Sequence, residues 1–520
     1  MKTRTDKTIK NSIWAGIHII LQMLVSFIAQ KIFINILNVE YLGINGLFSN
    51  IISFLGIAEL GLGEAIIFHL YKPIAANDKK KIKSYLKLYK KAYNTIAIIV
   101  LIVGTAIIPI LPYFIGEVNI DENINIIYFL FLLQTVFSYL ISYKRSIIYA
   151  YQDNYIISII DVFYTVLMHT LQILSLVITK NYYIYLITKM VCIIIENYII
   201  SKVADAKYPF IKEKNVAKLT KKENRDIIER LKAQFFHKIG GVVVGASDNL
   251  IISKFINVST VGIYSNYNMV ISAIQNLFVK FISAIIPSVG NLLVEKDYKK
   301  NYEVYKRVRF LNFWIATFAS IGILVVIQDF IKLWLGEEYL LEITVVIALC
   351  INNYQKIMRA YNDSFLSAAG ICIETKFVPL IESTINIIVS IILLKIMGLQ
   401  GVFWGTIISG LALWCYSYPK YAYKKLLNRS YTQYYRETIG YLVLFLALGF
   451  ITYWMSTLIK IKNTLLSFII NLLLVITIPN IVIIIIFHKT DNYQYYVHLI
   501  KNKIKELRYK NVKKREKKKI

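Results

Sequence analysis

The chain contains 520 residues, 57% of them hydrophobic, and its mean hydropathy is +0.55. Soluble domains average about 45–50% apolar residues, so this composition excludes a soluble protein. The formal net charge of +29 suggests a nucleic-acid partner at first. The basic residues are concentrated between long apolar runs, however, and this distribution is typical of membrane topology, so we expect no nucleic acid to bind.

The apolar runs are about 20 residues or longer, which is enough for a helix to cross a ~30 Å hydrocarbon core. The sequence therefore predicts an all-α polytopic membrane protein with about fourteen transmembrane helices. The predicted spans are 13–37, 42–70, 93–115, 124–148, 155–178, 183–202, 235–257, 261–293, 310–333, 340–366, 376–397, 401–419, 439–460 and 464–488.

Basic residues mark the span ends that we expect to face the cytoplasm. The N-terminal arm, the loops 72–91, 203–234, 294–309 and 420–438, and the tail 489–520 hold 44 of the 60 Lys and Arg. By the positive-inside rule, this asymmetry predicts a multi-pass membrane protein with both termini in the cytoplasm. The same segments attract anionic membrane lipids, at about 1 kcal/mol per basic residue near the surface. The first span is longer than a signal-peptide core, so we expect it to remain as an anchor.

No motif in the sequence indicates catalysis. There is no GK[ST] phosphate-binding loop, no HExxH, no CxxC and no GxSxG. The four cysteines, at 192, 350, 372 and 415, have no paired spacing, which indicates packing residues. We therefore expect neither enzyme activity, nor a metal site, nor any cofactor.

Short sequence segments recur in the same order along the chain and indicate an internal repeat. NVEYLGIN at 38–45 is matched by NVSTVGIY at 257–264, and KKIKSYLKLYKK from Lys80 is matched by KKNYEVYKRVR from Lys299, both 219 residues later. The pattern predicts two parallel six-helix repeats around a central cavity, followed by two C-terminal helices. The predicted segments are an N-terminal lobe (1–205), a basic cytoplasmic linker (206–234), a C-terminal lobe (235–420), an extra helix pair (421–488) and a basic cytoplasmic tail (489–520).

Several of these segments resemble a known family. They are FINILNVEYLGINGLFSNIISFLGIAELGLGEAI in the first two spans, LYKPIAANDKKKI after them, and SDNLIISKFINVSTVGIYSNYN at 247–268. The chain resembles the bacterial polysaccharide-biosynthesis flippases of the multidrug/oligosaccharidyl-lipid/polysaccharide exporter superfamily. The resemblance implies fourteen helices in two lobes around a cavity. It also implies that undecaprenyl-pyrophosphate-linked oligosaccharide units move from the inner to the outer leaflet of the bacterial cytoplasmic membrane, for surface or capsular polysaccharide. The implied partners are this lipid-linked oligosaccharide and anionic lipids, with a polysaccharide polymerase and glycosyltransferases as further candidates.

Two other functions are weighed against a flippase. A cation-coupled multidrug exporter of the same superfamily would need mainly acidic residues in its cavity and few basic ones. A membrane enzyme, such as a glycan polymerase, commonly presents its catalytic groups on a sizeable loop, whereas the outer loops expected here are only a few residues long.

Acidic residues inside the predicted spans are candidates for ion coupling or for lining the cavity. A charge at mid-bilayer costs at least ~2.5–3.5 kcal/mol, so each needs a cavity or a partner. The candidates are Glu59, Glu64, Asp161 and Asp248. Each either serves transport or is buried for helix packing. Near the first two, Gly56, Gly61 and Gly63 either allow close helix packing or break the helix so that freed carbonyl groups line a cavity.

Basic residues inside the spans are candidates for binding a pyrophosphate. They are Lys31, Lys254, Lys280, Lys356 and Arg359. Arginine can hold a phosphate with two parallel hydrogen bonds, whereas lysine acts as a point charge. The first two either contact substrate or extend to the outer interface, and the last two either contact substrate or anchor the cytoplasmic end. Lys280 follows polar residues well inside its span and is the strongest candidate.

Overall fold

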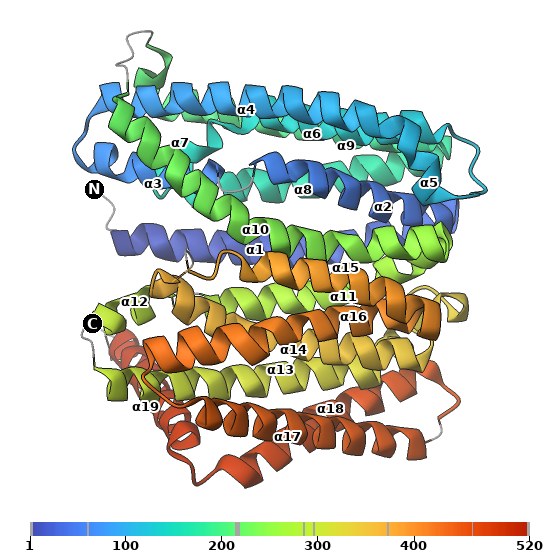
Figure 1. Cartoon of the computed structure of the whole chain (residues 1–520), viewed down its shortest axis with the longest axis vertical. Helices are drawn as coiled ribbons and strands as arrows, with labels where there is room; N and C mark the ends of the chain where they lie inside the picture. Colours follow the sequence, from blue (N-terminus) through green and yellow to red (C-terminus); the bar gives the residue numbers. More distant parts are fainter. Residues whose placement is uncertain are drawn as a thin grey trace. The chain divides into compact units, whose positions relative to one another are not determined.

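A computed structural model of the chain describes residues 4–59, 62–213, 219–283, 286–294, 297–371, 374–459 and 461–516. Every regular element in these ranges is helical (Figure 1). The all-α membrane class predicted from the apolar runs is therefore confirmed.

The helices form two compact units, of which the first comprises residues 1–266 and 374–405. In it, α8 packs between α1 and α9, and α6 packs against both α4 and α9 (Figure 1). Its elements are α1 (Arg4–Leu37), α2 (Val39–Leu55), η1 (Gly56–Glu59), α3 (Leu62–Ala75), α4 (Lys79–Ile107), η2 (Ile108–Ile110), α5 (Leu111–Ile115), α6 (Ile124–Ser142), α7 (Arg145–Ala150), α8 (Asn154–Thr179), α9 (Tyr182–Lys207), η3 (Pro209–Lys212), α10 (Lys221–Phe255), the start of α11 (Val258–Ser283), α15 (Val378–Met397) and the first half of α16 (Leu399–Ala412).

The second unit comprises residues 267–373 and 406–520. In it, α13 packs against α14, α17 and α18. Besides the ends of α11 and α16, its elements are α12 (Ile286–Val294), α13 (Tyr298–Trp334), η4 (Glu337–Tyr339), α14 (Ile343–Ala368), the π-helical segment η6 (Leu413–Leu426), α17 (Tyr431–Leu458), α18 (Thr464–Phe487) and α19 (Asp491–Glu516). These units do not follow the lobe boundaries expected from the repeat, and the two-lobe division stays a prediction.

Ten helices in the described part of the chain are long and apolar enough to cross a membrane. The predicted spans at 42–70, 235–257, 261–293 and 340–366 are not among them. The helix α2 has only 17 residues and is too short for this criterion, and α14 contains several buried asparagines, which lower its hydropathy. The number of fourteen spans therefore stays a prediction.

The repeat detected in the sequence is also seen in the positions at which helices begin. The helices α2 and α11 begin at Val39 and Val258, which are 219 residues apart, as are the starts of α4 and α13 and those of α6 and α14. The capping chemistry repeats as well. The side chains of Asp78 and Asp297 each accept hydrogen bonds from backbone N–H groups in the first turn of α4 and α13. Such a cap stabilises a helix start by about 1 kcal/mol.

Equivalent positions of the two repeats meet where α2 approaches α11 in the first unit. A Cβ atom on Gly43 would lie 2.0 Å from the carbonyl oxygen of Val258, and one on Gly262 would lie 2.2 Å from that of Val39. Gly43 and Gly262 are equivalent by the 219-residue offset, and so are Val39 and Val258. A contact in which the same positions meet from both sides is the signature of a two-fold relation. It supports a two-fold relation between the two repeats, and their parallel orientation stays a prediction.

The predicted span 42–70 is interrupted at its glycines. The helix α2 ends at Leu55, Gly56–Glu59 form a 3₁₀ turn, and α3 begins at Leu62. A Cβ atom on Gly56 or Gly63 would meet only ordinary contacts, at 3.4 and 3.5 Å. The helix is therefore interrupted, whereas the lining of a cavity by freed carbonyl groups stays a prediction, and Gly61 lies outside the described residues.

Candidate functional site

An arginine and two carboxylates meet between three helices of the first unit, at residues that we call the Arg145 cluster: Arg145, Asp161, Glu196 and Asn197. The Arg145 Nη2 donates to the Glu196 Oε1 at 2.7 Å, and its Nη1 lies 3.4 Å from the Asp161 Oδ1. The Arg145 Nε donates to the Asn197 Oδ1 at 3.1 Å. All three charged side chains are about one-fifth exposed, at 23%, 19% and 19%.

The local fold explains how the Arg145 cluster forms. Arg145 is the first residue of the short helix α7, which contacts both α8 and α9. Asp161 lies two turns into α8, and Glu196 faces it from α9, so the two carboxyl groups are neighbours. The neighbouring Asn197 donates its amide to the Ile193 carbonyl oxygen at 3.0 Å, which orients the oxygen that receives Arg145.

The start of α8 is held by a second ionic contact. The Asp153 carboxylate accepts from the ammonium groups of Lys7 and Lys207, at 2.7 and 2.6 Å, and from the Tyr208 hydroxyl at 2.8 Å. Burial opposes ionisation of Asp153, but the hydrogen bonds from Lys207, Lys7 and Tyr208 outweigh it, so the pKa of this carboxyl lies below its usual value. The contact therefore persists at neutral pH and ties α1, α8 and α9 together beside the Arg145 cluster.

The Arg145 cluster has an imbalance of charge. One guanidinium faces two carboxylates, so a negative charge remains when both acids are ionised. Two adjacent carboxylates resist simultaneous ionisation, because like charges at short range repel. The arrangement can therefore take up and release one proton, or hold one further cation, while Arg145 keeps the other carboxylate ionised.

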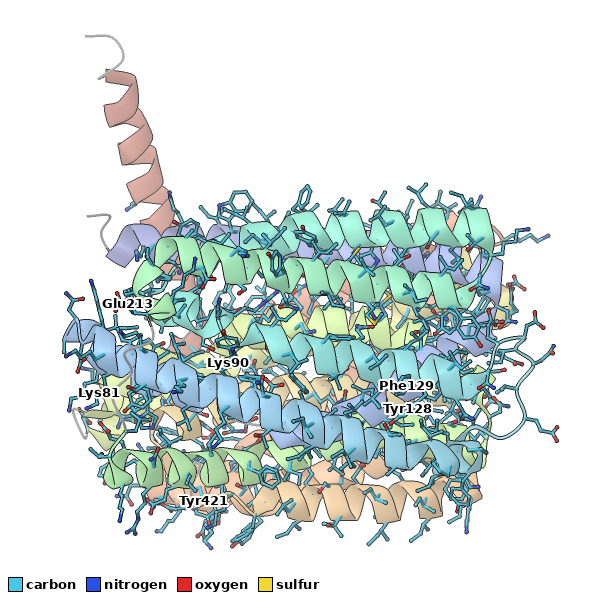
Figure 2. The ribbon with its side chains drawn as sticks, turned by 90° about the horizontal axis from the view of Figure 1, so that it is seen from above. Lys81, Lys90, Tyr128, Phe129, Glu213 and Tyr421 are labelled. Atoms are coloured by element: carbon cyan, nitrogen blue, oxygen red, sulfur yellow. The ribbon has the colours of Figure 1, made fainter. Side chains whose placement is uncertain are left out.

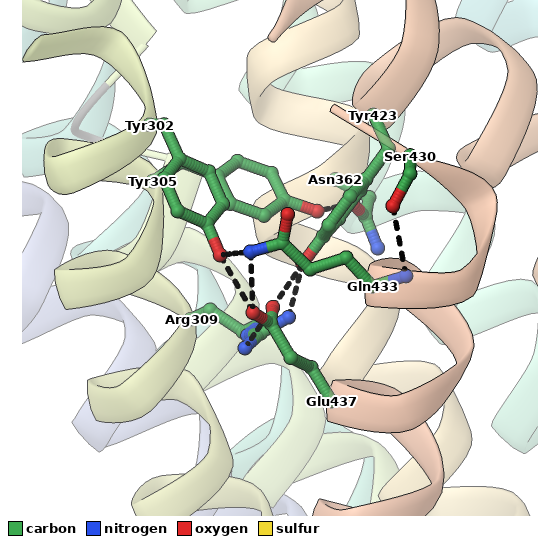
Figure 3. Close-up of polar contacts among 8 residues, drawn as sticks. All are labelled: Tyr302, Tyr305, Arg309, Asn362, Tyr423, Ser430, Gln433 and Glu437. Carbon is green, nitrogen blue, oxygen red and sulfur yellow. Dashed lines mark hydrogen bonds and ion pairs between the residues drawn. The ribbon is translucent and has the colours of Figure 1, made fainter. Parts of the chain in front are cut away.

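The second unit holds a network that we call the Arg309 cluster: Tyr302, Arg309, Tyr423, Gln433 and Glu437 (Figure 3). The Arg309 Nη2 lies 2.7 Å from the Glu437 Oε2. The same carboxylate accepts from the hydroxyls of Tyr302 and Tyr423, at 2.6 and 2.7 Å, and from the Gln433 amide at 3.0 Å. Arg309 also donates to the Tyr423 hydroxyl. These residues join α13, η6 and α17.

Arg309 and Glu437 form a buried one-to-one ion pair, although the Arg309 Nε has no hydrogen-bond partner among the described residues. The cluster has one guanidinium and one carboxylate, and Arg309 is only 4% exposed. Every oxygen of Glu437 has at least one donor. A buried ion pair of this kind is retained when hydrogen bonds replace the lost water, and it resists protonation changes.

The predicted basic residues do not gather in one place within either unit. Lys31 on α1 and Lys280 on α11 are exposed. The Lys254 ammonium on α10 lies 3.3 Å from the centre of the Tyr113 ring, so this lysine makes a cation–π contact. Lys356 and Arg359 share α14 and are half-buried. A role for these five residues in binding substrate stays a prediction.

The predicted acids have different surroundings. Glu59 in η1 accepts from the Tyr93 hydroxyl at 2.8 Å. Asp161 belongs to the Arg145 cluster, and Asp248 on α10 is buried, with 5% of its surface exposed. The side chain of Glu64 lies outside the described residues. Their role in ion coupling stays a prediction as well.

Sequence reasoning missed both arginines at the centre of the two clusters. Arg145 falls inside the predicted span 124–148, and an arginine in a span needs a carboxylate partner, so a usable signal was present. Arg309 sits at the edge of a basic loop, where the positive-inside rule already explains it. Its partner Glu437 is 128 residues away, and no local pattern connects the two.

Similar folds are found among solved transporter structures. A structure of the lipid II flippase MurJ in an inward closed conformation matches with a TM-score of 0.68 at 14% identity, over 92% of this chain and 99% of that one. An inward-facing multidrug resistance MATE family transporter of the MOP superfamily matches with a TM-score of 0.61 at 14% identity, over 75% of this chain and 92% of that one. A Vibrio cholerae MATE transporter matches with a TM-score of 0.54 at 12% identity, over 79% of this chain and 97% of that one.

At these identities, the structural matches establish the fold, which is that of membrane transporters and flippases. No curated protein sequence matches the chain. Residues 8–293, which are more than half of the chain, match the family described as polysaccharide biosynthesis protein. The resemblance inferred from the sequence motifs is thereby confirmed, and the chain belongs to the polysaccharide biosynthesis protein family.

Proposed function

We propose that this protein is a flippase that moves undecaprenyl-pyrophosphate-linked oligosaccharide units across the bacterial cytoplasmic membrane. The family match over residues 8–293 is the observation that carries the proposal, because it links the chain to polysaccharide biosynthesis. The likeness to a lipid II flippase over 92% of the chain supports a large, lipid-linked cargo. The family and fold are those of transporters and flippases, which are not enzymes.

The transport mechanism that we propose is alternating access between two lobes, 1–205 and 235–420. The matched helix starts and the reciprocal contact of Gly43 and Gly262 support two equivalent halves. Two equivalent halves can rock about a shared site, and this motion exposes the site to each side of the membrane in turn. The five predicted cations would attract the pyrophosphate, and glycosyltransferases and a polymerase would act before and after transport.

The test of this function is deletion of the gene followed by analysis of surface polysaccharide. We expect one polysaccharide to disappear from the surface while its lipid-linked repeat unit accumulates on the cytoplasmic side. Complementation with the intact gene is the control. Normal surface polymer in a strain without a second family member would overturn the proposal.

A multidrug exporter is the second candidate function. The MATE-like fold and the extra carboxylate of the Arg145 cluster favour it, since cation-coupled exporters need acids that titrate. Efflux assays in a drug-hypersensitive host separate the two candidates. Drug resistance conferred by the gene, with surface polysaccharide unaffected by its deletion, would establish the exporter.

The orientation that we propose places both termini in the cytoplasm. Single cysteines introduced at Asn119 and Asn463, between helices, should react with an impermeant thiol reagent added to intact cells. A cysteine introduced at Asn215, which lies outside the described residues, should react only after the cells are opened. Labelling of position 215 in intact cells would reverse the orientation.

A further inference from the structure

A pocket lined by four lysines lies in the first unit, at the start of α4. Its volume is about 450 Å³, and its walls are Lys83, Leu86, Lys87, Lys90, Tyr143, Lys144 and Ile211. These residues come from α4, from the segment after α6, and from η3. Figure 2 looks onto this face of the unit, where Lys90 on α4 and Glu213 after η3 are labelled. The volume falls in the range of ligand-binding pockets.

Two of the four lysines are already neutralised. The Lys83 ammonium lies 2.8 Å from the Glu213 carboxylate, and that of Lys144 lies 2.7 Å from the Asp205 carboxylate. These pairs hold two walls of the pocket in place, since Lys83 is only 4% exposed and Lys144 only 17%. The pocket is therefore preformed, and its ion pairs contribute little net charge.

The other two lysines leave the pocket positive. Lys87 and Lys90 are exposed, and no carboxylate in the described part of the chain forms an ion pair with either. They are three residues apart, so their side chains leave the same face of α4. The Lys90 and Lys144 ammonium groups each lie 5.9 Å from the centre of the Tyr143 ring, one on α4 and one after α6. Converging lysines around an aromatic wall suit a compact anion such as a phosphate group.

The surface beside the pocket is apolar and suits acyl chains. The helix α4 changes from a basic segment to an apolar one just after Lys91. Ile98 and Ile102 on the apolar part are 58% and 63% exposed. Ile98 lies eleven residues after Lys87, about three helical turns, so the two share one face of α4 about 16 Å apart. The pocket is thus positioned where hydrocarbon meets lipid headgroups.

We propose that this pocket binds the phosphate group of a membrane lipid, with the acyl or isoprenoid chain lying along α4. Basic pockets beside membrane helices commonly bind anionic headgroups, whereas scattered surface lysines only attract the bilayer as a whole. The phosphate comes either from a bulk phospholipid or from an isoprenoid diphosphate, and both have the same group for the lysines to bind. The site does not depend on the proposed transport function.

The test is native mass spectrometry of the purified full chain in detergent with added phosphatidylglycerol. The variant Lys87→Gln with Lys90→Gln removes the two unpaired charges from exposed positions. The matched control is Lys91→Gln with Lys202→Gln, because both are exposed lysines of the same unit that do not line the pocket. We expect affinity for phosphatidylglycerol to fall on the order of tenfold in the pocket variant and to stay unchanged in the control.

Two further probes complete the experiment. Diacylglycerol with the same acyl chains lacks the phosphate and should not bind. Displacement of phosphatidylglycerol by undecaprenyl diphosphate would identify the isoprenoid lipid as the occupant, and resistance to displacement would identify bulk phospholipid; either result supports a phosphate site. Equal losses in the pocket and control variants, or equal binding of diacylglycerol, would overturn it.

Discussion

The Arg145 and Arg309 clusters use the same ingredients and differ in their balance. Arg309 is 4% exposed and faces one carboxylate, which also accepts hydrogen bonds from two tyrosine hydroxyls and an amide. Arg145 faces two carboxylates in a setting that is about one-fifth exposed. In the first arrangement, one positive charge is paired with one negative charge. The second has a surplus negative charge that requires a proton or a cation.

This difference separates a role in holding helices from a role in transport. A balanced, buried network loses much when one member is removed, because its partner is left as an uncompensated charge. An unbalanced cluster tolerates the loss of its surplus acid, because the charges that remain are then paired. Substitutions in the Arg309 cluster should therefore lower stability, whereas removal of an acid from the Arg145 cluster should affect transport more than stability.

The largest effect on stability is expected from Arg309→Gln. Removal of the guanidinium leaves Glu437 buried without a cation, at a cost of about 3–5 kcal/mol. Thermal unfolding of the purified protein in detergent, together with its abundance in the membrane, measures this loss. Combining Arg309→Met with Glu437→Leu should recover much of the stability, because no charge is then left unpaired. An Arg309→Gln variant as stable as the parent would show that the network is not structural.

A smaller loss is expected from Tyr302→Phe. This change keeps the ring but removes the hydrogen bond that the hydroxyl donates to Glu437 and the one that it accepts from the Gln433 amide. We expect a loss of about 1.5–3 kcal/mol, the range for hydrogen bonds to charged groups. Tyr435→Phe is a suitable control, because its hydroxyl donates to an uncharged group, the Cys415 backbone carbonyl oxygen. The same unfolding measurement applies. Equal losses of unfolding free energy in both variants would mean that the hydrogen bond to the Glu437 carboxylate contributes no more than one to a backbone carbonyl.

In the Arg145 cluster, Glu196→Gln should change stability by less than about 1 kcal/mol. The variant keeps one carboxylate opposite Arg145, so the charges become balanced and no group is stranded. If the Arg145 cluster couples transport to a proton, transport by this variant should also lose its dependence on external pH, because only one of the two acids remains. Transport of lipid-linked oligosaccharide into proteoliposomes at several pH values measures this. An unchanged pH profile would remove the Arg145 cluster from coupling, and Glu59 would be the next residue to test.

The repeat and the helical class were accessible from sequence because they rest on local patterns. NVEYLGIN and NVSTVGIY sit at the starts of α2 and α11, where capping and close approach restrict the residue types. The partners of the interior charges were not accessible. Asp161 was singled out as an isolated acid, and only the fold brings Arg145 and Glu196 to it. Arg309 and Glu437 meet through packing between α13 and α17, which leaves no periodic trace in the sequence.

The smallest effect on stability is expected from Lys280→Gln, which lies outside both clusters. Lys280 is exposed on α11, and no carboxylate in the described ranges forms an ion pair with it. Its removal therefore strands no charge, and unfolding and membrane abundance should stay at the parent level.

If the Lys280 ammonium attracts the pyrophosphate during transport, activity should still fall, and Lys280→Arg should retain part of the activity because the charge remains. The substitution Lys299→Gln, at an exposed position in the first turn of α13, serves as a control for loss of a single surface charge. Normal transport by Lys280→Gln would remove this residue from the cargo path. Lower abundance would instead assign it a structural partner, like that of Arg309.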